Sequence, residues 1–97
     1  MRAQKFVDEM KKKIYQEKGQ IKHYSDYAIE SRLNLLRNLE RIFNIDLDDK
    51  VISLNAGKQF LIDIRNKKIE DLAHTPYSNA FRHYFECMTG IYIGRIF

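Results

Sequence analysis

A group of polar side chains in the stretch TPYSNAFRHYFECMTG, residues 75–90, could bind a nucleic acid. Because successive residues of a helix are 100° apart, these side chains fall on the arc opposite the aromatic residues. Hydroxyl, amide, guanidinium and imidazole groups contact phosphates and base edges in protein–DNA complexes. The same arc could equally be an ordinary solvated surface. The candidates are Ser78, Asn79, Arg82 and His83 on this arc, with Thr75 at its start.

No spacing of residues predicts catalysis, a metal or a cofactor. The three histidines are widely spaced, no second cysteine accompanies Cys87, and no glycine-rich phosphate loop is present. Cys87 falls among apolar residues, which is typical of a small hydrophobic side chain rather than a nucleophile. The segment NIDLDDK, residues 44–50, lacks the glycine and distal glutamate of a calcium loop, so we interpret it as a solvated turn. We therefore expect no enzyme, no cofactor and no small-molecule substrate.

The lysine-rich start of the chain is a second candidate surface. The formal net charge is +4, from 17 basic and 13 acidic residues, and residues 1–22 hold seven basic side chains against three acidic ones. Lys11, Lys12 and Lys13 lie beside the apolar stripe of a predicted helix, where they could contact phosphates or form a solvated face. A basic balance of this size permits nucleic-acid binding without requiring it.

Two predicted helices cover the first half of the chain. Residues 3–18 carry a narrow apolar stripe that reaches Ile14, and Gly19 is the expected stop. After a connector at residues 20–24, Ser25 caps a helix that runs to Asn44 and is apolar over roughly half of its circumference. Arg32 lies within that apolar arc. It is either paired with an acidic residue inside the bundle or placed at the edge of the bundle to reach an anion.

Two more helices complete the predicted fold. Ser53 or Asn55 caps a helix to about Lys68, in which Gly57 is a mild cost, and Leu72 then returns to the core. The last helix runs from a cap at Thr75 to Gly90. We therefore predict an all-α fold, a compact bundle of about four helices. Its core is expected to include the apolar positions of each helix: Ala3, Phe6, Val7, Met10 and Ile14; Ala28, Ile29, Leu33, Leu35, Leu36, Leu39, Ile42 and Phe43; Leu54, Ala56, Phe60, Leu61 and Ile64; and Tyr77, Ala80, Phe81, Tyr84, Phe85, Cys87 and Met88.

The length of 97 residues predicts one domain. We expect residues 1–90 to form the bundle, with the first helix either packed on it or peripheral, and residues 91–97 to be a linker or the truncated start of a following element. No stretch is apolar for long enough to span a bilayer, and no secretory signal is present. With a single cysteine as well, a cytoplasmic location without membrane contact is the natural expectation.

Residues 20–90 resemble the core-binding domain of tyrosine recombinases and phage-type integrases, a SAM-like helical bundle. The resemblance is carried by YSDYAIESRLNLLRNLERIFNIDLDD and by TPYSNAFRHYFECMTG. It implies one half of a clamp that places helices in the major groove of duplex DNA near the crossover site, whereas a separate C-terminal catalytic domain, outside this chain, cleaves. The DNA-facing surface it implies comprises Tyr24, Ser25 and Tyr27 with Ser78, Asn79, Arg82 and His83. Arg32, Lys58 and Thr75 complete the candidate set.

Residues 23–74 and 75–97 carry formal charges of −1 and +1, so we expect the chain alone to bind duplex DNA only weakly. A second hypothesis is a small stand-alone helical module, an inhibitor or adaptor of a mobile element, that holds a protein partner. A reading frame that continues past Phe97 into a recombinase catalytic domain would favour the first hypothesis.

Overall fold

The computed structural model describes residues 1–67 and 74–94, which form four α-helices, one 3₁₀ helix and one β-hairpin. The protein is therefore mostly helical, and the all-α prediction missed a small two-stranded sheet. In chain order the elements are α1 (Ala3–Lys12), β1 (Ile14–Glu17), β2 (Gln20–His23), α2 (Asp26–Phe43), η1 (Leu47–Lys50), α3 (Leu54–Asn66) and α4 (His74–Thr89).

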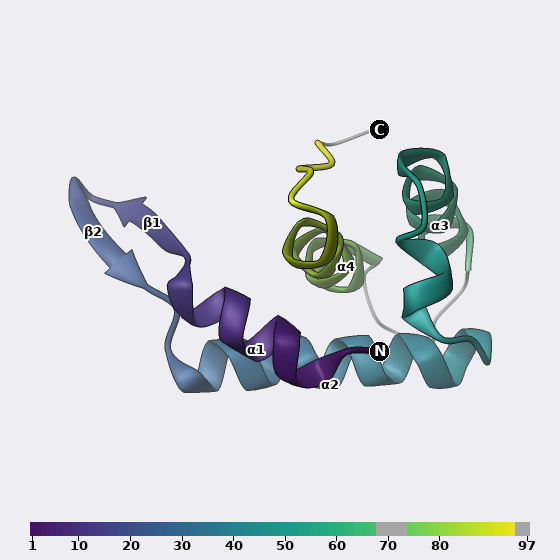
Figure 1. Ribbon diagram of the computed structural model, residues 1–97, viewed down its shortest axis with the longest axis horizontal. Coiled ribbons are helices and arrows are strands. Elements are labelled where there is room, and N and C mark those ends of the chain that lie inside the picture. Colours follow the sequence, from purple (N-terminus) through teal and green to yellow (C-terminus); the bar gives the residue numbers. More distant parts are fainter. Residues whose placement is uncertain (68–73, 95–97) are drawn as a thin grey trace.

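Helix α4 occupies the middle of the bundle, where α1, α2 and α3 all contact it (Figure 1). Helix α1 also packs along α2, and α3 stands at one end of the molecule. The hairpin projects from the other end, beyond the helices (Figure 1). The surface of the hairpin is therefore separated from the surface of α3 by the width of the bundle.

Most of the predicted core is confirmed. Leu36 and Tyr84 are fully buried, and the predicted apolar positions of α2 and α4 are buried or partly buried. The prediction is wrong for Leu54, which lies in the first turn of α3 and is 38% exposed. Phe6 and Met10 are also fully buried, so α1 is packed on the bundle and is not peripheral. The predicted return of Leu72 to the core lies outside the described residues.

The prediction of a helix over residues 3–18 is wrong after Lys12, because the chain turns into the hairpin. Lys18 and Gly19 both have positive φ angles, 51° and 77°. Two successive residues of this kind form the tight turn whose twist matches that of two antiparallel strands. Gly19 thus belongs to the turn between two strands and does not end a helix, and the expected connector at residues 20–24 is mostly β2. Ile14, placed on the helical stripe, is 59% exposed.

Most of the predicted helix ends are confirmed. The Oγ atoms of Ser25 and Ser53 accept hydrogen bonds at 3.1 Å from the third backbone amide beyond them, which satisfies a free donor of the first turn. Asn44 and Gly90 close α2 and α4 with positive φ angles of 53° and 76°. The predicted cap at Thr75 is wrong, because α4 already includes His74.

The acidic segment at residues 44–50 is not simply a solvated turn. Asp46 caps η1 and accepts a hydrogen bond from the amino group of Met1 at 2.7 Å. Asp48 accepts from the Tyr84 hydroxyl and from Nε of Arg2, the latter at 3.3 Å. Glu40 joins them by accepting from the Met1 amino group at 3.1 Å. These carboxylates therefore tie the start of α1 to η1 and α4.

The segment after Gly90 is anchored by one residue. Ile93 is 1% exposed and lies against Gly57 of α3, while Ile91 and Tyr92 are exposed. Residues 91–94 form no regular element, and residues 95–97 lie outside the described part of the chain. The expectation of a linker therefore does not extend to Ile93, which belongs to the core.

Candidate nucleic-acid interface

The hairpin has two chemically different faces. Its register pairs Ile14 with His23, Tyr15 with Lys22, Gln16 with Ile21, and Glu17 with Gln20. Because paired residues point to the same side and neighbours in a strand alternate, Tyr15, Glu17, Gln20 and Lys22 share one face. Tyr15 and Lys22 are partly buried, whereas all four residues of the opposite face are exposed. One face therefore packs against the bundle and the other faces solvent.

The net positive charge of the protein lies in the hairpin and in the last residues of α1 before it. Residues 11–23 contain five lysines and one acidic residue, Glu17, so their formal charge is 5 − 1 = +4, equal to that of the whole chain. The lysines are Lys11, Lys12, Lys13, Lys18 and Lys22. Lys11 and Lys12 end α1, Lys13 connects it to β1, and Lys18 and Lys22 lie on the hairpin, which projects beyond the helices (Figure 1). Positive charge of this kind favours acidic or phosphate-bearing partners.

Ion pairs within the chain engage three of these lysines. Lys12 lies 3.4 Å from Glu9 and Lys22 lies 3.2 Å from Glu17, and both pairs are solvent-exposed. Pairs of this kind contribute about 0–1 kcal/mol, so they compete weakly with a phosphate. Lys13 pairs with Glu86 of α4 at a less exposed position and is better explained as a contact that fixes the hairpin to the bundle.

Tyr24 connects the hairpin to the helices through its ring contacts. Its ring lies 4.9 Å from the ring of Tyr15 and 5.6 Å from that of His83, measured between centroids. The guanidinium of Arg32 lies 5.0 Å from the centre of the Tyr24 ring and donates to the Ala28 carbonyl at 3.1 Å. The structure thus brings together three predicted site residues, Tyr24, Arg32 and His83. Among the residues that the structure describes, Arg32 contacts a ring and a carbonyl rather than the acidic partner considered for it.

The surroundings of Tyr24 disfavour a positive charge on His83 in addition to that of Arg32. Burial of the ring, followed by the nearby charges of Arg32 and Lys13, lowers the pKa of His83 from 6.5 to about 4. Glu86 acts in the opposite direction with a smaller effect. His83 is therefore neutral at pH 7. It contributes a ring contact with Tyr24 and adds no charge to the basic residues of the surface.

The predicted polar arc of α4 is only partly on the surface. Ser78 and Arg82 are 2% and 7% exposed, so the expectation that both face outward is wrong. The reason is the central position of α4, because helices on several sides cover more of its circumference than one neighbour would. Asn79 and Thr75 are exposed, and Asn79 accepts a hydrogen bond from Arg82 at 3.1 Å. This arc offers few exposed groups to a ligand.

The remaining candidates lie apart from one another. Ser25 is occupied as the cap of α2, and the neighbouring Tyr27 is 85% exposed. Lys58 is an exposed residue of α3, at the end of the molecule opposite the hairpin (Figure 1). A single flat surface could not include both Lys58 and the hairpin lysines. Cys87 is buried, and burial raises the pKa of its thiol to about 11, as for an inert hydrophobic residue.

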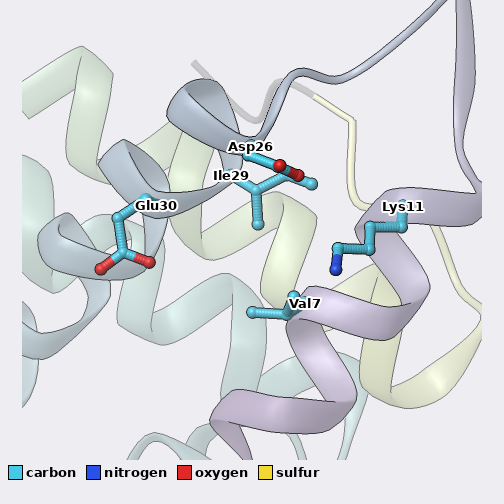
Figure 2. Close-up of a pocket in the computed structure, with 5 residues that line it drawn as sticks. All are labelled: Val7, Lys11, Asp26, Ile29 and Glu30. Atoms are coloured by element: carbon cyan, nitrogen blue, oxygen red, sulfur yellow. The ribbon is translucent and has the colours of Figure 1, made fainter.

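A small groove lies between α1 and the first turns of α2. Figure 2 shows Val7 and Lys11 on one side and Asp26, Ile29 and Glu30 on the other. Its volume is about 200 Å³, and its rim carries two carboxylates against one ammonium. The groove is therefore not suited to an anion such as a phosphate. Within residues 1–67 and 74–94, no cluster of three or more potential metal ligands occurs, and no helix there could cross a membrane.

The hairpin residues were missed because the pattern at residues 14–23 also fits a helix that ends at Gly19. The signal that could have identified them is the pair Lys18–Gly19 between two four-residue segments, IYQE and QIKH, each of which contains an isoleucine. Lysine is not a usual first residue of such a turn, which weakens the signal.

The chain matches no family model, no curated protein and no solved structure. The likeness to recombinase core-binding domains therefore depends on the sequence pattern of residues 20–90.

Proposed function

We propose that this chain is a non-catalytic module that binds duplex DNA, with the hairpin and the end of α1 as its main contact surface. The observation that carries this proposal is the location of the full formal excess of positive charge in residues 11–23, which comprise the end of α1 and the hairpin that projects from the bundle. Lysines in such a position neutralise phosphates and release counterions, which supplies the affinity of non-specific DNA binding.

The helical bundle supports a more specific proposal, that the chain is a core-binding domain of a tyrosine recombinase. The order of α2, α3 and α4, together with the caps at Ser25 and Gly90, fits the resemblance in residues 20–90. The buried state of Ser78 and Arg82 argues against α4 as a major DNA contact. We therefore assign the principal contact to the hairpin, and a minor one to the exposed Tyr27 at the start of α2.

A protein-binding adaptor is the alternative function. The observation that favours it is the exposure of two large apolar residues on the hairpin, Ile14 at 59% and Ile21 at 65%. Isolated exposed apolar residues are common on monomeric proteins, but two on the same face of a hairpin are also found at interfaces. The lysines around them would select a partner with an acidic surface.

Fluorescence anisotropy with a labelled duplex, over a series of salt concentrations, tests the proposal. We expect dissociation constants of about 10⁻⁴–10⁻⁶ M at physiological salt, tightening steeply as the salt falls. The double variant Lys12→Gln/Lys18→Gln should bind more weakly, and its slope of log K against log salt should be smaller by about 1 for each phosphate that it no longer neutralises. The matched control Lys5→Gln/Lys58→Gln removes the same charge outside the hairpin and should retain most of the affinity.

Two outcomes would contradict the proposal. Absence of binding at about 50 mM salt would show that the chain does not bind duplex DNA with the expected affinity, and it would favour the adaptor. An equal decrease of affinity in both double variants would show that net charge alone, rather than the hairpin, attracts the DNA.

A further inference from the structure

The side chains on the solvent face of the hairpin are exposed and are not part of the packing of the bundle. Its four residues are Ile14, Gln16, Ile21 and His23, all exposed, with no acidic residue among them. The only acidic residue of the hairpin, Glu17, lies on the opposite face with Tyr15 and Lys22. An anionic ligand could therefore approach this face between flanking lysines without meeting a carboxylate on it.

The charge around this face argues against a second copy of the chain as its partner. Two hairpins in contact would bring together two segments that each carry a formal charge of +1 over residues 14–23, or +4 with Lys11, Lys12 and Lys13 included, and lysines on exposed strands are a common device against such pairing. A polyanion is favoured by the same charges. Among polyanions, the dimensions select duplex DNA, because the B-form major groove is about 12 Å wide and admits a two-stranded ribbon, whereas the A-form major groove of RNA is too narrow.

The side chains of this face suit one kind of base pair. A glutamine amide bonds to N6 and N7 of adenine, and apolar side chains contact the methyl group of thymine. Gln16 and Ile21 are directly paired across the strands, so their Cβ atoms are about 5 Å apart. That separation is comparable with the rise of about 3.4 Å between base pairs, so the two side chains can reach the same or adjacent pairs.

We propose that the solvent face of the hairpin enters the major groove of B-form DNA and prefers A·T pairs, with Gln16 bonded to adenine and with Ile14 and Ile21 against thymine methyl groups. This inference rests on the proposed function and specifies its substrate. Lys18 at the turn and Lys12 at the end of α1 then lie at the two ends of the ribbon, where the phosphate chains border the groove.

The chain offers a matched pair of variants for the test. Gln16→Ala alters the solvent face, whereas Gln20→Ala removes the same side chain from the opposite face of the same hairpin. Binding is measured by anisotropy at one low salt concentration to three duplexes of equal length: an A·T duplex, the same duplex with deoxyuridine in place of thymidine, and a G·C duplex. Circular dichroism checks that both variants remain folded.

We expect the wild type to bind the A·T duplex at least about fivefold more tightly than the G·C duplex, the lower end of the discrimination given by one bidentate contact. Removal of the thymine methyl groups should weaken wild-type binding. Gln16→Ala should lose most of the A·T preference, and Gln20→Ala should keep it. The deoxyuridine comparison uses wild-type protein, so it holds even if a variant fails to fold.

Equal wild-type affinity for all three duplexes would overturn this inference while leaving the proposed function intact, because phosphate contacts alone would then explain the binding. An A·T preference that deoxyuridine does not change, and that both variants keep, would also overturn it and would indicate the minor groove, which lacks the methyl group. Absence of binding to every duplex would reject the proposed function itself.

Discussion

Gly57 of α3 lies so close to Phe85 of α4 that a Cβ atom on Gly57 would be 2.6 Å from Cε2 of the phenyl ring. The same atom would be 2.9 Å from Cδ1 of Ile93. Both neighbours are almost completely buried, so neither has free space into which to move. Gly57 is therefore the residue that lets α3 approach α4, although helix propensity alone makes a glycine within a helix only a cost.

Replacing Gly57 with alanine should destabilise the protein despite the better helix propensity of alanine. The propensity gain is about 1 kcal/mol, whereas overpacking of a filled core costs about 1–3 kcal/mol. With approaches this short we expect a net loss of about 1–2 kcal/mol in the free energy of unfolding, measured by urea denaturation. Lys58→Ala, at the exposed neighbouring position, is the control and should change stability little. A stabilised Gly57→Ala variant would show that α3 and α4 can separate freely.

Arg82→Ala should lower stability, because Arg82 is buried and is not an ordinary surface residue. The substitution removes the packed aliphatic stem and the hydrogen bond to Asn79. We expect a decrease of about 1–3 kcal/mol in the free energy of unfolding, measured by chemical denaturation. Asn79→Ala removes the other partner from an exposed position and serves as the comparison, with a smaller decrease. If the two variants proved equally stable, the hydrogen bond rather than the burial of Arg82 would account for its effect.

His83 should make the stability depend on pH in the mildly acidic range. Its folded pKa is about 4, mainly because the ring is buried and Arg32 and Lys13 lie nearby, whereas an unfolded histidine titrates near 6.5. Between these values the unfolded chain binds the proton more readily, so stability is present above pH 6.5 and decreases as the pH falls towards 4. His83→Gln should flatten this part of the curve of unfolding free energy against pH.

His23→Gln makes the same substitution at an exposed position and should change the stability little. Proton NMR of the ring can follow the titration of His83 directly, and an ordinary pKa near 6.5 would contradict the environment described for it.

Tyr84→Phe should test the link between the start of the chain and η1. The hydroxyl accepts from the Arg2 amide at 2.9 Å and donates to Asp48. Its removal leaves the carboxylate without this donor, at a cost of about 1–2 kcal/mol in thermal or urea unfolding. Tyr27→Phe removes the same atom from a ring that is 85% exposed and should change stability by less than about 0.5 kcal/mol.

The Tyr84 hydroxyl also predicts a signature at alkaline pH. Burial, together with the hydrogen bond to Asp48, raises the pKa of Tyr84 above its usual value of 10. The stability due to the protonated hydroxyl is thus complete below pH 10 and declines as the pH rises past it. The difference in unfolding free energy between the wild type and Tyr84→Phe should therefore narrow above pH 10. A constant difference would place the hydroxyl in contact with water.

Features that depend on local physics were predictable from the amino-acid sequence. Ser25, Ser53 and Gly90 are recognisable because capping requires particular side chains or a positive φ angle at one position. The burial of many apolar helical positions, Leu36 and Tyr84 among them, follows from helical periodicity.

The remaining features depend on contacts between elements that are far apart in the sequence. Residues 14–23 fit a helix or a hairpin, and the hairpin is supported by the contact of Tyr15 with Tyr24, a residue of the following connection. The burial of Arg82 depends on how many helices surround α4, and the role of Gly57 depends on a ring 28 positions further along the chain. Periodicity defines the faces of one helix, but it does not specify how many of those faces its neighbours cover.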